Sequence, residues 1–247
     1  MKVKVVGSSS SGNCYILESP TGKLILDCGM PWKDTLKALN FDLSNVVGCL
    51  VTHCHKDHSK AVVDVMKAGI TAYLNVGTCD HMNLEYWACG TYRLSFARAL
   101  EKFQILDFEI LPFDTEHDVP SLGYIIKYIP TGETILFATD TYMIRYNFKG
   151  LNYILLETNY CKDTLDKNVA DGFIDVSMKK RLLKSHFSLE NVKIFLDRTD
   201  LSKVQKIILL HLSDRNSDSD RILKEVSKYA DTVIAEPGME IILGCTF

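Results

Sequence analysis

The feature that most constrains this chain is a continuous apolar run, Val46–Thr52, that leads directly into the sequence His53-Cys54-His55-Lys56-Asp57-His58. An uninterrupted apolar run suits a strand that is buried on both faces. After the histidines, apolar residues recur at helical spacing up to Gly69, which is a suitable helix end. The histidine-rich segment is therefore expected on a loop between a buried strand and a helix, where layered folds often carry catalytic groups.

The histidine-rich segment predicts a metal site. Three imidazoles and one carboxylate within six residues are costly to bury unless something satisfies them. His53 and His55, two apart on an extended loop, can face one point, while Asp57 and His58 turn toward a second. Neutral imidazole and carboxylate together suit zinc, iron or manganese. The alternative is a solvated polar loop with chance histidines, which the buried strand before it disfavours.

Three further polar residues each follow the end of an apolar run: His117, Asp140 and His211. Alone, each would be interpreted as a surface or capped group. Together with the histidine-rich segment, they are typical of ligands that arrive from neighbouring strand ends. Asp140 has two oxygens and can offer one to each of two ions, which together would lower the pKa of a shared water. The pattern predicts two divalent metal ions, zinc or manganese.

Composition limits the remaining possibilities. With 247 residues and 47% hydrophobic content, the chain is expected to form one domain over 1–247. Its net charge of −3 excludes a polyanion binder that is basic throughout, although local basic patches can still hold nucleic acid. None of the eight cysteines forms a Cys-x-x-Cys pair, which disfavours a zinc knuckle. With no signal-peptide run and no stretch that would span a membrane, we expect a cytoplasmic protein with reduced thiols.

Strand-rich stretches with interleaved helices in both halves predict an α+β fold, two packed sheets with helices outside. The ordered set of candidate ligands also resembles the metallo-β-lactamase superfamily, and the resemblance covers nearly the whole chain. It implies a four-layer αββα sandwich with a two-metal site at one edge. The resemblance further implies that the first metal is held by His53, His55 and His117, and the second metal by Asp57, His58 and His211. Asp140 would bridge the two metals. Asp27, in Leu26-Asp27-Cys28-Gly29, would orient a ligand.

A narrower resemblance is to the YycJ-type exonuclease group and its phage-encoded relatives, which are nucleic-acid phosphodiesterases. It is carried by short segments: Gly7–Asn13, Thr115–Asp118, Glu157–Tyr160, Ser185–Ser188 and His211–Ser213. The His-Leu-Ser ending is also similar to ribonuclease Z. One departure is His58-Ser59-Lys60-Ala61, where family members often have His-x-x-Gly. The departure bears on substrate detail and not on the metal site.

His186 matches a family histidine outside the primary ligands. It is expected to contact a phosphate or to donate a proton to the leaving oxygen; the alternative is a helix N-terminal histidine bonded to the backbone.

For each of the other candidates for substrate contact, a purely structural role is the alternative. The Ser11 and Asn13 turn could present amides to a phosphate or merely join strands. Arg181, in the basic run 179–184, could bind a nucleic-acid backbone or face solvent. Asn159 and Tyr160 follow a strand, and Tyr160 could stack on a base or be partly buried.

The leading hypothesis is metal-dependent hydrolysis of phosphodiesters in DNA, from an end of the chain. In it Asp57 or Asp140 orients the nucleophile and His186 assists the leaving oxygen. A cyclic-nucleotide phosphodiesterase or a ribonuclease of the same fold remains an alternative. A thioester or lactam hydrolase and a non-catalytic DNA-binding protein stabilised by metals are less favoured. The resemblance also suggests a homodimer.

Overall fold

The computed structural model describes residues 1–84 and 93–244, which divide into two compact units. Unit 1 comprises Met1–Asp114, Val119–Gly132 and Glu236–Phe247. Unit 2 comprises Thr115–Asp118 and Glu133–Ala235. Both units contain strands and helices, as the sequence predicts, and each is described by itself. None of the described helices is long and apolar enough to cross a lipid bilayer.

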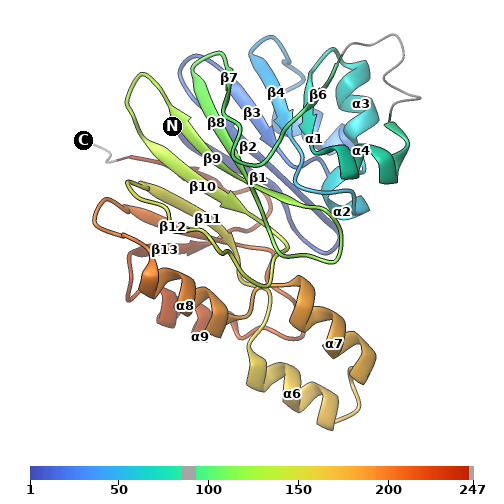
Figure 1. Ribbon diagram of the computed structural model, residues 1–247, viewed down its shortest axis with the longest axis vertical. Helices are drawn as coiled ribbons and strands as arrows, with labels where there is room; N and C mark the ends of the chain where they lie inside the picture. The colour runs from blue at the N-terminus through green and yellow to red at the C-terminus, as the bar shows by residue number, and fades with distance from the viewer. Residues whose placement is uncertain (85–92, 245–247) are drawn as a thin grey trace. The chain divides into compact units, whose positions relative to one another are not determined.

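The main sheet of unit 1 has seven strands in the order β14-β1-β2-β3-β4-β5-β6 (Figure 1). Its strands are β1 Lys2–Ser9, β2 Gly12–Glu18, β3 Lys23–Leu26, β4 Val46–Leu50, β5 Ala72–Leu74, β6 Leu94–Phe96 and β14 Glu240–Ile242. The strands from β14 to β3 pair antiparallel, and those from β3 to β6 pair parallel. Strand β4 is the apolar run predicted before the histidines, and it lies inside the sheet.

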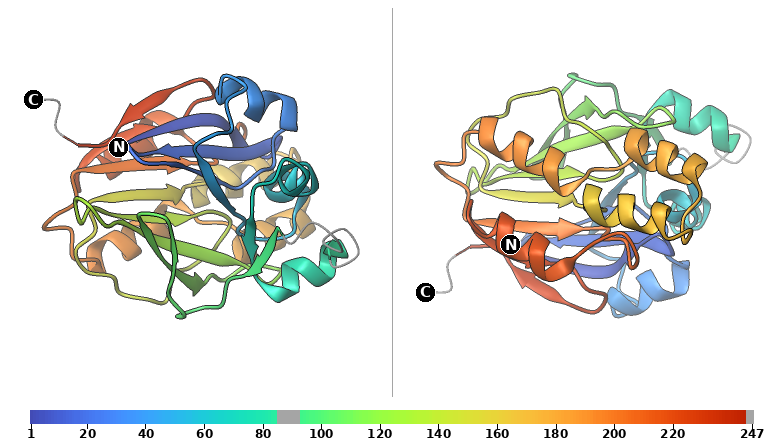
Figure 2. Two further views of the ribbon diagram at one scale, coloured as in Figure 1. Left: turned by 90° about the horizontal axis from the view of Figure 1, so that it is seen from above. Right: turned by 90° about the horizontal axis from the view of Figure 1, so that it is seen from below.

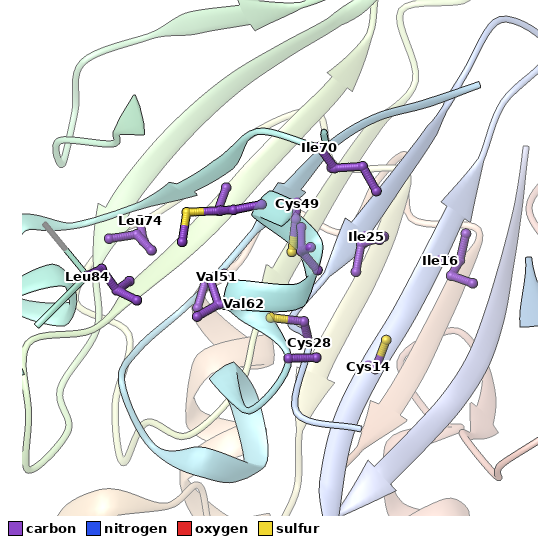
Figure 3. Packing of buried hydrophobic residues seen from close by; sticks show 14 of the residues in the cluster. Cys14, Ile16, Ile25, Cys28, Cys49, Val51, Val62, Ile70, Leu74 and Leu84 are labelled. Atoms are coloured by element: carbon purple, nitrogen blue, oxygen red, sulfur yellow. The ribbon is translucent and has the colours of Figure 1, made fainter. Parts of the chain in front are cut away.

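Four helices of unit 1 follow these strands: α1 Trp32–Ala38, α2 Lys56–Ser59, α3 Val62–Lys67 and α4 Val76–Met82. The core between the sheet and α3 is shown in Figure 3, where Cys14 and Ile16 of β2 and Cys49 of β4 share one cluster with Val62. Alternate strand residues point to the same face, so one face of the sheet supplies this layer. The predicted helix after the histidines is confirmed as α3, and Gly69 follows its end with φ of 84°.

Unit 1 also contains an antiparallel meander of β7 Phe103–Ile105, β8 Phe108–Asp114 and β9 Leu122–Tyr128. Two hydrogen bonds tie β9 to the residues just before His53. The Tyr124 hydroxyl donates to the Val51 carbonyl at 2.7 Å, and the Leu122 amide donates to the Thr52 carbonyl at 3.0 Å. The start of the histidine loop is thus held from both the sheet and the meander.

Unit 2 is built on four parallel strands in the order β13-β12-β11-β10. They are β10 Thr134–Ala138, β11 Tyr153–Glu157, β12 Lys206–Leu210 and β13 Asp231–Ile234. Strands β11 and β12 are buried almost throughout, as expected for parallel strands covered on both faces. The carboxyl ends of parallel strands meet at one edge, so residues that follow β10, β11 and β12 come together there.

The helices of unit 2 are α6 Lys162–Ala170, α7 Val176–Ser185, α8 Leu189–Arg198 and α9 Ser219–Val226. Ser188 is the N-cap of α8, as serine often is at this position, and its Oγ accepts from the Asn191 amide. Asp218 caps α9 by accepting from the Arg221 amide, while the Ser217 hydroxyl donates to the Ser213 carbonyl. Helices α6 and α7 lie side by side as a pair, away from α8 and α9 (Figures 1 and 2).

Candidate metal centre

Unit 1 brings together three histidines of the predicted set. His53 Nε2 lies 3.1 Å from His55 Nδ1, and the ring centroids of His53 and His58 are 4.3 Å apart. Asp57 Oδ2 lies 3.5 Å from His58 Nε2. His53 and His58 are fully buried. We call these four residues the histidine loop cluster; its nitrogen and oxygen donors suit a divalent cation.

Asp27 fixes the ring orientation of two of these histidines. One carboxylate oxygen, Oδ2, lies 2.7 Å from His58 Nδ1, and the other accepts from the Thr52 amide and hydroxyl at 2.8 and 2.9 Å. The Thr52 oxygen lies 3.0 Å from His53 Nδ1. Because Thr52 donates its proton to Asp27, its oxygen accepts from His53 Nδ1–H. His53 and His58 therefore both keep a lone pair on Nε2, as a metal ligand requires.

Gly29 lets the loop after β3 approach the histidine loop closely. A Cβ atom at position 29 would lie 1.7 Å from the Asp57 carbonyl oxygen. Beside it the Cys28 amide donates to the His58 carbonyl at 2.8 Å, and the Gly29 amide donates to the Asn13 carbonyl at 2.9 Å. These bonds and the absent side chain hold the backbone of Asp57 and His58 in place.

The Ser/Gly turn between β1 and β2 holds two of the predicted substrate residues. Asn13 is fully buried, and its Nδ2 lies 3.1 Å from both His58 Nε2 and the Ser9 carbonyl. Asn13 thus lies against a candidate ligand. Ser11 is exposed, and its amide donates to Ser9 Oγ at 3.2 Å within the turn. A role for either residue in holding phosphate stays a prediction.

Unit 2 gathers a second group of donors, which we call the strand-end cluster: Asp140, Glu157, His186 and His211. Each offers one ligand atom, and the four atoms lie within 4.8 Å of one another. Asp140 and His211 follow β10 and β12, and Glu157 is the last residue of β11. His211 Nδ1 lies 2.8 Å from Asp140 Oδ1 and 3.3 Å from Glu157 Oε1.

Glu157 is the site residue that sequence reasoning missed. It is fully buried, and its Oε2 accepts from the amides of Thr141 and Phe187 at 3.0 and 3.1 Å. Its Oε1 lies 2.6 Å from His186 Nδ1. The signal was present in the sequence, because Glu157 ends a buried apolar run just as Asp140 and His211 follow theirs. His186 stands at the C-terminal end of α7, and its ring Nδ1 bonds to this carboxylate.

Electrostatics in the strand-end cluster favour cations. Burial lowers the pKa of His211, but the carboxylates of Asp140 and Glu157 outweigh it and raise that pKa to about 10. At His186 burial also lowers the pKa, but the same two carboxylates outweigh it, so the pKa of His186 is raised. Without metal the cluster therefore binds protons on its histidines. A divalent cation would replace such protons at the same anionic site.

His117 belongs to unit 2 and lies three residues beyond the end of β8. Its Nδ1 donates to the Ser185 carbonyl at 2.8 Å, which leaves the lone pair on Nε2. Burial lowers its pKa, so the ring favours the neutral, ligand-competent form. Asp118 Oδ1 lies 3.1 Å from His117 Nε2, and Asp118 Oδ2 also pairs with Arg181 at 3.5 Å.

Three of the candidate site residues have a strained backbone. The φ angles of Asp27, Asp140 and His211 are 56°, 40° and 52°, in the left-handed region that non-glycine residues rarely occupy. Each residue follows the end of a strand by one or two positions. Such strain costs on the order of 1 kcal/mol per residue and concentrates at functional sites. It therefore marks the same strand ends as the ligand chemistry does.

Two other predicted substrate residues are buried. Asn159 Nδ2 donates to the His211 carbonyl at 3.0 Å, so this side chain holds the backbone of a candidate ligand. Tyr160 has no exposed surface. Its ring is therefore not accessible to a nucleobase, which contradicts the possibility that it stacks on a base. Arg181 lies exposed on α7. His81, to which the sequence assigned no role, bonds to the Gly77 carbonyl.

Comparison with known proteins gives one family match and several relatives. A model of the metallo-beta-lactamase superfamily matches residues 9–141. The chain is 27% identical over 228 residues to exodeoxyribonuclease WalJ of Streptococcus pneumoniae, covering 87% of this chain and 83% of the relative. It is 24% identical over 242 residues to exodeoxyribonuclease YycJ of Bacillus anthracis, covering 94% of this chain and 88% of the relative.

Among solved structures, the metallo-beta-lactamase fold protein YhfI from Bacillus subtilis matches with a TM-score of 0.73 and 16% identity. The match covers 98% of this chain and 99% of that one. Likeness at this identity speaks to the fold alone. It confirms the predicted class, an α+β fold of the four-layer αββα type.

Proposed function

Because this chain belongs to the metallo-β-lactamase superfamily, we propose that it is a metal-dependent phosphodiester hydrolase that degrades DNA from an end. The observation that carries the proposal is the strand-end cluster, in which the proton-bearing pair Glu157 and His186 lies directly beside Asp140 and His211. The names of the two relatives, both exodeoxyribonucleases, support DNA as the substrate. The proposal applies to the 1–247 chain as a single metallo-hydrolase domain.

The donors of both clusters fit two divalent ions, zinc or manganese, because they are imidazole nitrogens and carboxylate oxygens. As the family ligand order implies, the first ion would be held by His53, His55 and His117, and the second by Asp57, His58 and His211, with Asp140 shared. Bound there, the ions supply a water of lowered pKa and positive charge opposite the phosphate. Support from the structure comes from hydrogen bonds within each unit, which leave the lone pair on Nε2 of His53 and His58 in unit 1 and of His117 in unit 2.

The remaining steps are assigned to side chains of this chain. Glu157 accepts from His186 Nδ1–H, which leaves Nε2 of the protonated ring to donate to the leaving oxygen. Asp57 or Asp140 orients the attacking water. Asp27 keeps the histidine loop cluster in one orientation through His58 and Thr52. Arg181 would meet the phosphate backbone, and Ser11 the end of the substrate.

We place the protein in the cytoplasm. All six cysteines among the described residues are free thiols, which agrees with a reducing compartment without requiring it.

The test is a timed digestion of end-labelled single- and double-stranded DNA and RNA with manganese, magnesium or zinc supplied. We expect progressive shortening of DNA from one end. Asp140→Ala should abolish this cleavage while circular dichroism and melting show a folded protein. Wild-type activity in that variant would rule out the mechanism.

The same assay separates the competing functions. Rapid digestion of RNA alone would favour a ribonuclease, and turnover confined to cyclic nucleotides would favour a small-molecule phosphodiesterase. Hydrolysis of nitrocefin or of a glutathione thioester, with DNA left intact, would assign the protein to another branch of the superfamily. A metal-loaded protein that binds DNA and cleaves none of these substrates would be a non-catalytic binding protein.

A further inference from the structure

Helix α7, like its neighbour α6, buries almost none of its side chains. Of its ten residues only Ser185 is buried. Helix α8 has the same length and buries four residues: Leu189, Val192, Phe195 and Leu196. A short helix with no buried apolar face gains little from packing and is marginal by itself in water. Its exposed side is therefore open to a partner.

The exposed side of α7 carries a mixed basic and apolar stripe. Val176, Lys180, Leu183 and Lys184 stand at helical positions i, i+4, i+7 and i+8, so they share one face. Val176 is 54% exposed and Leu183 is 38% exposed, and both lysines are exposed as well. We call these four residues the outer stripe. No acidic residue lies within the helix.

The cations of α7 divide into two kinds. Lys179 pairs with Asp166 of α6 at 2.6 Å, and Arg181 pairs with Asp118 at 3.5 Å. In the part of the chain that the structure describes, Lys180 and Lys184 form no ion pair. These two pairs help to hold α7 within unit 2, and the second keeps Arg181 beside Asp118, next to the candidate ligand His117. The two lysines of the outer stripe are left to meet an anion from outside.

The turn between α6 and α7 adds an aromatic pocket. A pocket of about 430 Å³ is lined by Asn168, Phe173, Ile174 and Arg215, and Phe173 is 71% exposed. Hydrogen bonds hold its walls: the Phe173 amide donates to the Asn168 carbonyl at 2.9 Å, and Asn168 Nδ2 donates to the Arg215 carbonyl at 2.8 Å. An exposed ring in a pocket that an arginine also lines suits a base that stacks and a phosphate that pairs.

The C-terminal end of α7 enters the candidate site of the same unit. His186 caps the helix and bonds to Glu157, and the preceding Ser185 carbonyl accepts from His117. A ligand that lies along the outer stripe would therefore run toward the strand-end cluster.

We propose that the outer stripe and the Phe173 pocket form a binding surface for single-stranded nucleic acid outside the reacting site. The lysines contact phosphates, and Phe173 stacks on a base without regard to sequence. Charge complementarity selects this occupant over a second copy of the chain. In a two-fold dimer through α7, the helix would face itself and bring its unpaired lysines together. The inference rests on the proposed function.

The first test removes the two unpaired cations. Lys180→Ala/Lys184→Ala is compared with Lys224→Ala/Lys228→Ala, an exposed pair with the same spacing and charge change in unit 2. We expect the KM for a single-stranded 20-mer to rise roughly ten-fold in the α7 variant only, with kcat unchanged. The slope of log affinity against log salt concentration should also become shallower by about 1.4, because each phosphate contact contributes about 0.7 to that slope for a single strand. Turnover of bis(p-nitrophenyl) phosphate, which is too small to extend from the site along the outer stripe, should not change.

The second test removes the ring. Phe173→Ala should weaken binding of the 20-mer several-fold, whereas Phe41→Ala should not, although Phe41 of unit 1 is 66% exposed. Unchanged 20-mer affinity in both α7-region variants would overturn the inference, as would a loss confined to double-stranded DNA. A change of oligomeric state in Lys180→Ala/Lys184→Ala, measured by light scattering, would assign the surface to self-association instead.

The outcome is separable from that of the proposed function. If the wild-type protein hydrolyses neither DNA nor bis(p-nitrophenyl) phosphate, the function fails. Anisotropy of a fluorescein-labelled 20-mer, measured on the same metal-loaded variants, still tests the surface directly.

Discussion

His186 Nδ1 lies 2.6 Å from Glu157 Oε1 at the carboxyl end of β11. The carboxylate is fully buried, and its other oxygen is held by two backbone amides. Because both oxygens have fixed partners, the His186 ring is fixed as well. The pair therefore holds one proton donor in one direction, beside the predicted ligands Asp140 and His211.

Loss of the Glu157 charge should change the pH dependence of catalysis. Glu157→Gln keeps the size of the side chain but removes a charge that raises the pKa of His186. His186 would then lose its proton at lower pH, so the alkaline limb of kcat should move to lower pH. His186→Ala should remove that limb and reduce DNA cleavage roughly 10²- to 10⁴-fold, the usual range for a proton donor.

A leaving group that needs no proton provides the control for this prediction. Hydrolysis of bis(p-nitrophenyl) phosphate should fall much less than DNA cleavage in both variants, and metal content should be measured in each. An unchanged alkaline limb in Glu157→Gln would contradict the assignment.

Asp27 should control metal affinity without touching substrate. Asp27→Asn removes the carboxylate that accepts from His58 Nδ1 and from Thr52. We expect metal affinity, measured by competition with a chromophoric chelator, to fall about 10- to 100-fold, as for other partners of ligand histidines. Asp34→Asn on α1 is the control, since Asp34 pairs only with Lys37 among the described residues. Equal affinities in the two variants would contradict the orienting role.

Position 29 should tolerate no side chain. In Gly29→Ala the new Cβ would meet the backbone of Asp57, so the histidine loop must shift. We expect the free energy of unfolding to fall by about 1–3 kcal/mol, as in overpacked cores, and bound metal to be lost. Gly132→Ala has open space around it and should cost only about 1 kcal/mol from its positive φ, with metal content intact. Full metal binding by Gly29→Ala would refute this.

Metal uptake should release protons, and stability without metal should depend on pH. Despite the opposing effect of burial, Asp140 and Glu157 together raise the folded-state pKa of His211 to about 10, above its ordinary 6.5. The resulting stabilisation is complete below pH 6.5 and is lost as the pH rises toward 10. With both proteins kept metal-free by a chelator, we expect the Tm of the wild type to fall between pH 7 and pH 10 by more than the Tm of His211→Gln.

Calorimetry would measure the proton release directly. At pH 7.5 the heat of zinc binding should differ between buffers of different ionisation enthalpy, and the difference should shrink in His211→Gln. Identical heats in all buffers would mean that His211 carries no proton before metal binds.

The sequence predicted the secondary structure around the candidate ligands better than the contacts of those ligands. The strand before His53, the helix after His58 and the cap at Ser188 follow from local pattern, because periodicity and capping act over a few residues. Glu157 was not assigned a role, because its partner His186 is 29 residues away and only the fold joins them. The burial of Tyr160 and the contact of Asn13 with His58 likewise depend on packing that no local pattern encodes.

The left-handed backbone at Asp27, Asp140 and His211 has a consequence for protein engineering. Glycine is relaxed at such φ angles, so each of these residues stores conformational energy that a glycine would release. Selection for thermostability alone would gain only that strain, on the order of 1 kcal/mol per position, and would lose the buried hydrogen bonds that the three side chains make. A more stable variant is therefore better sought away from these three strand ends.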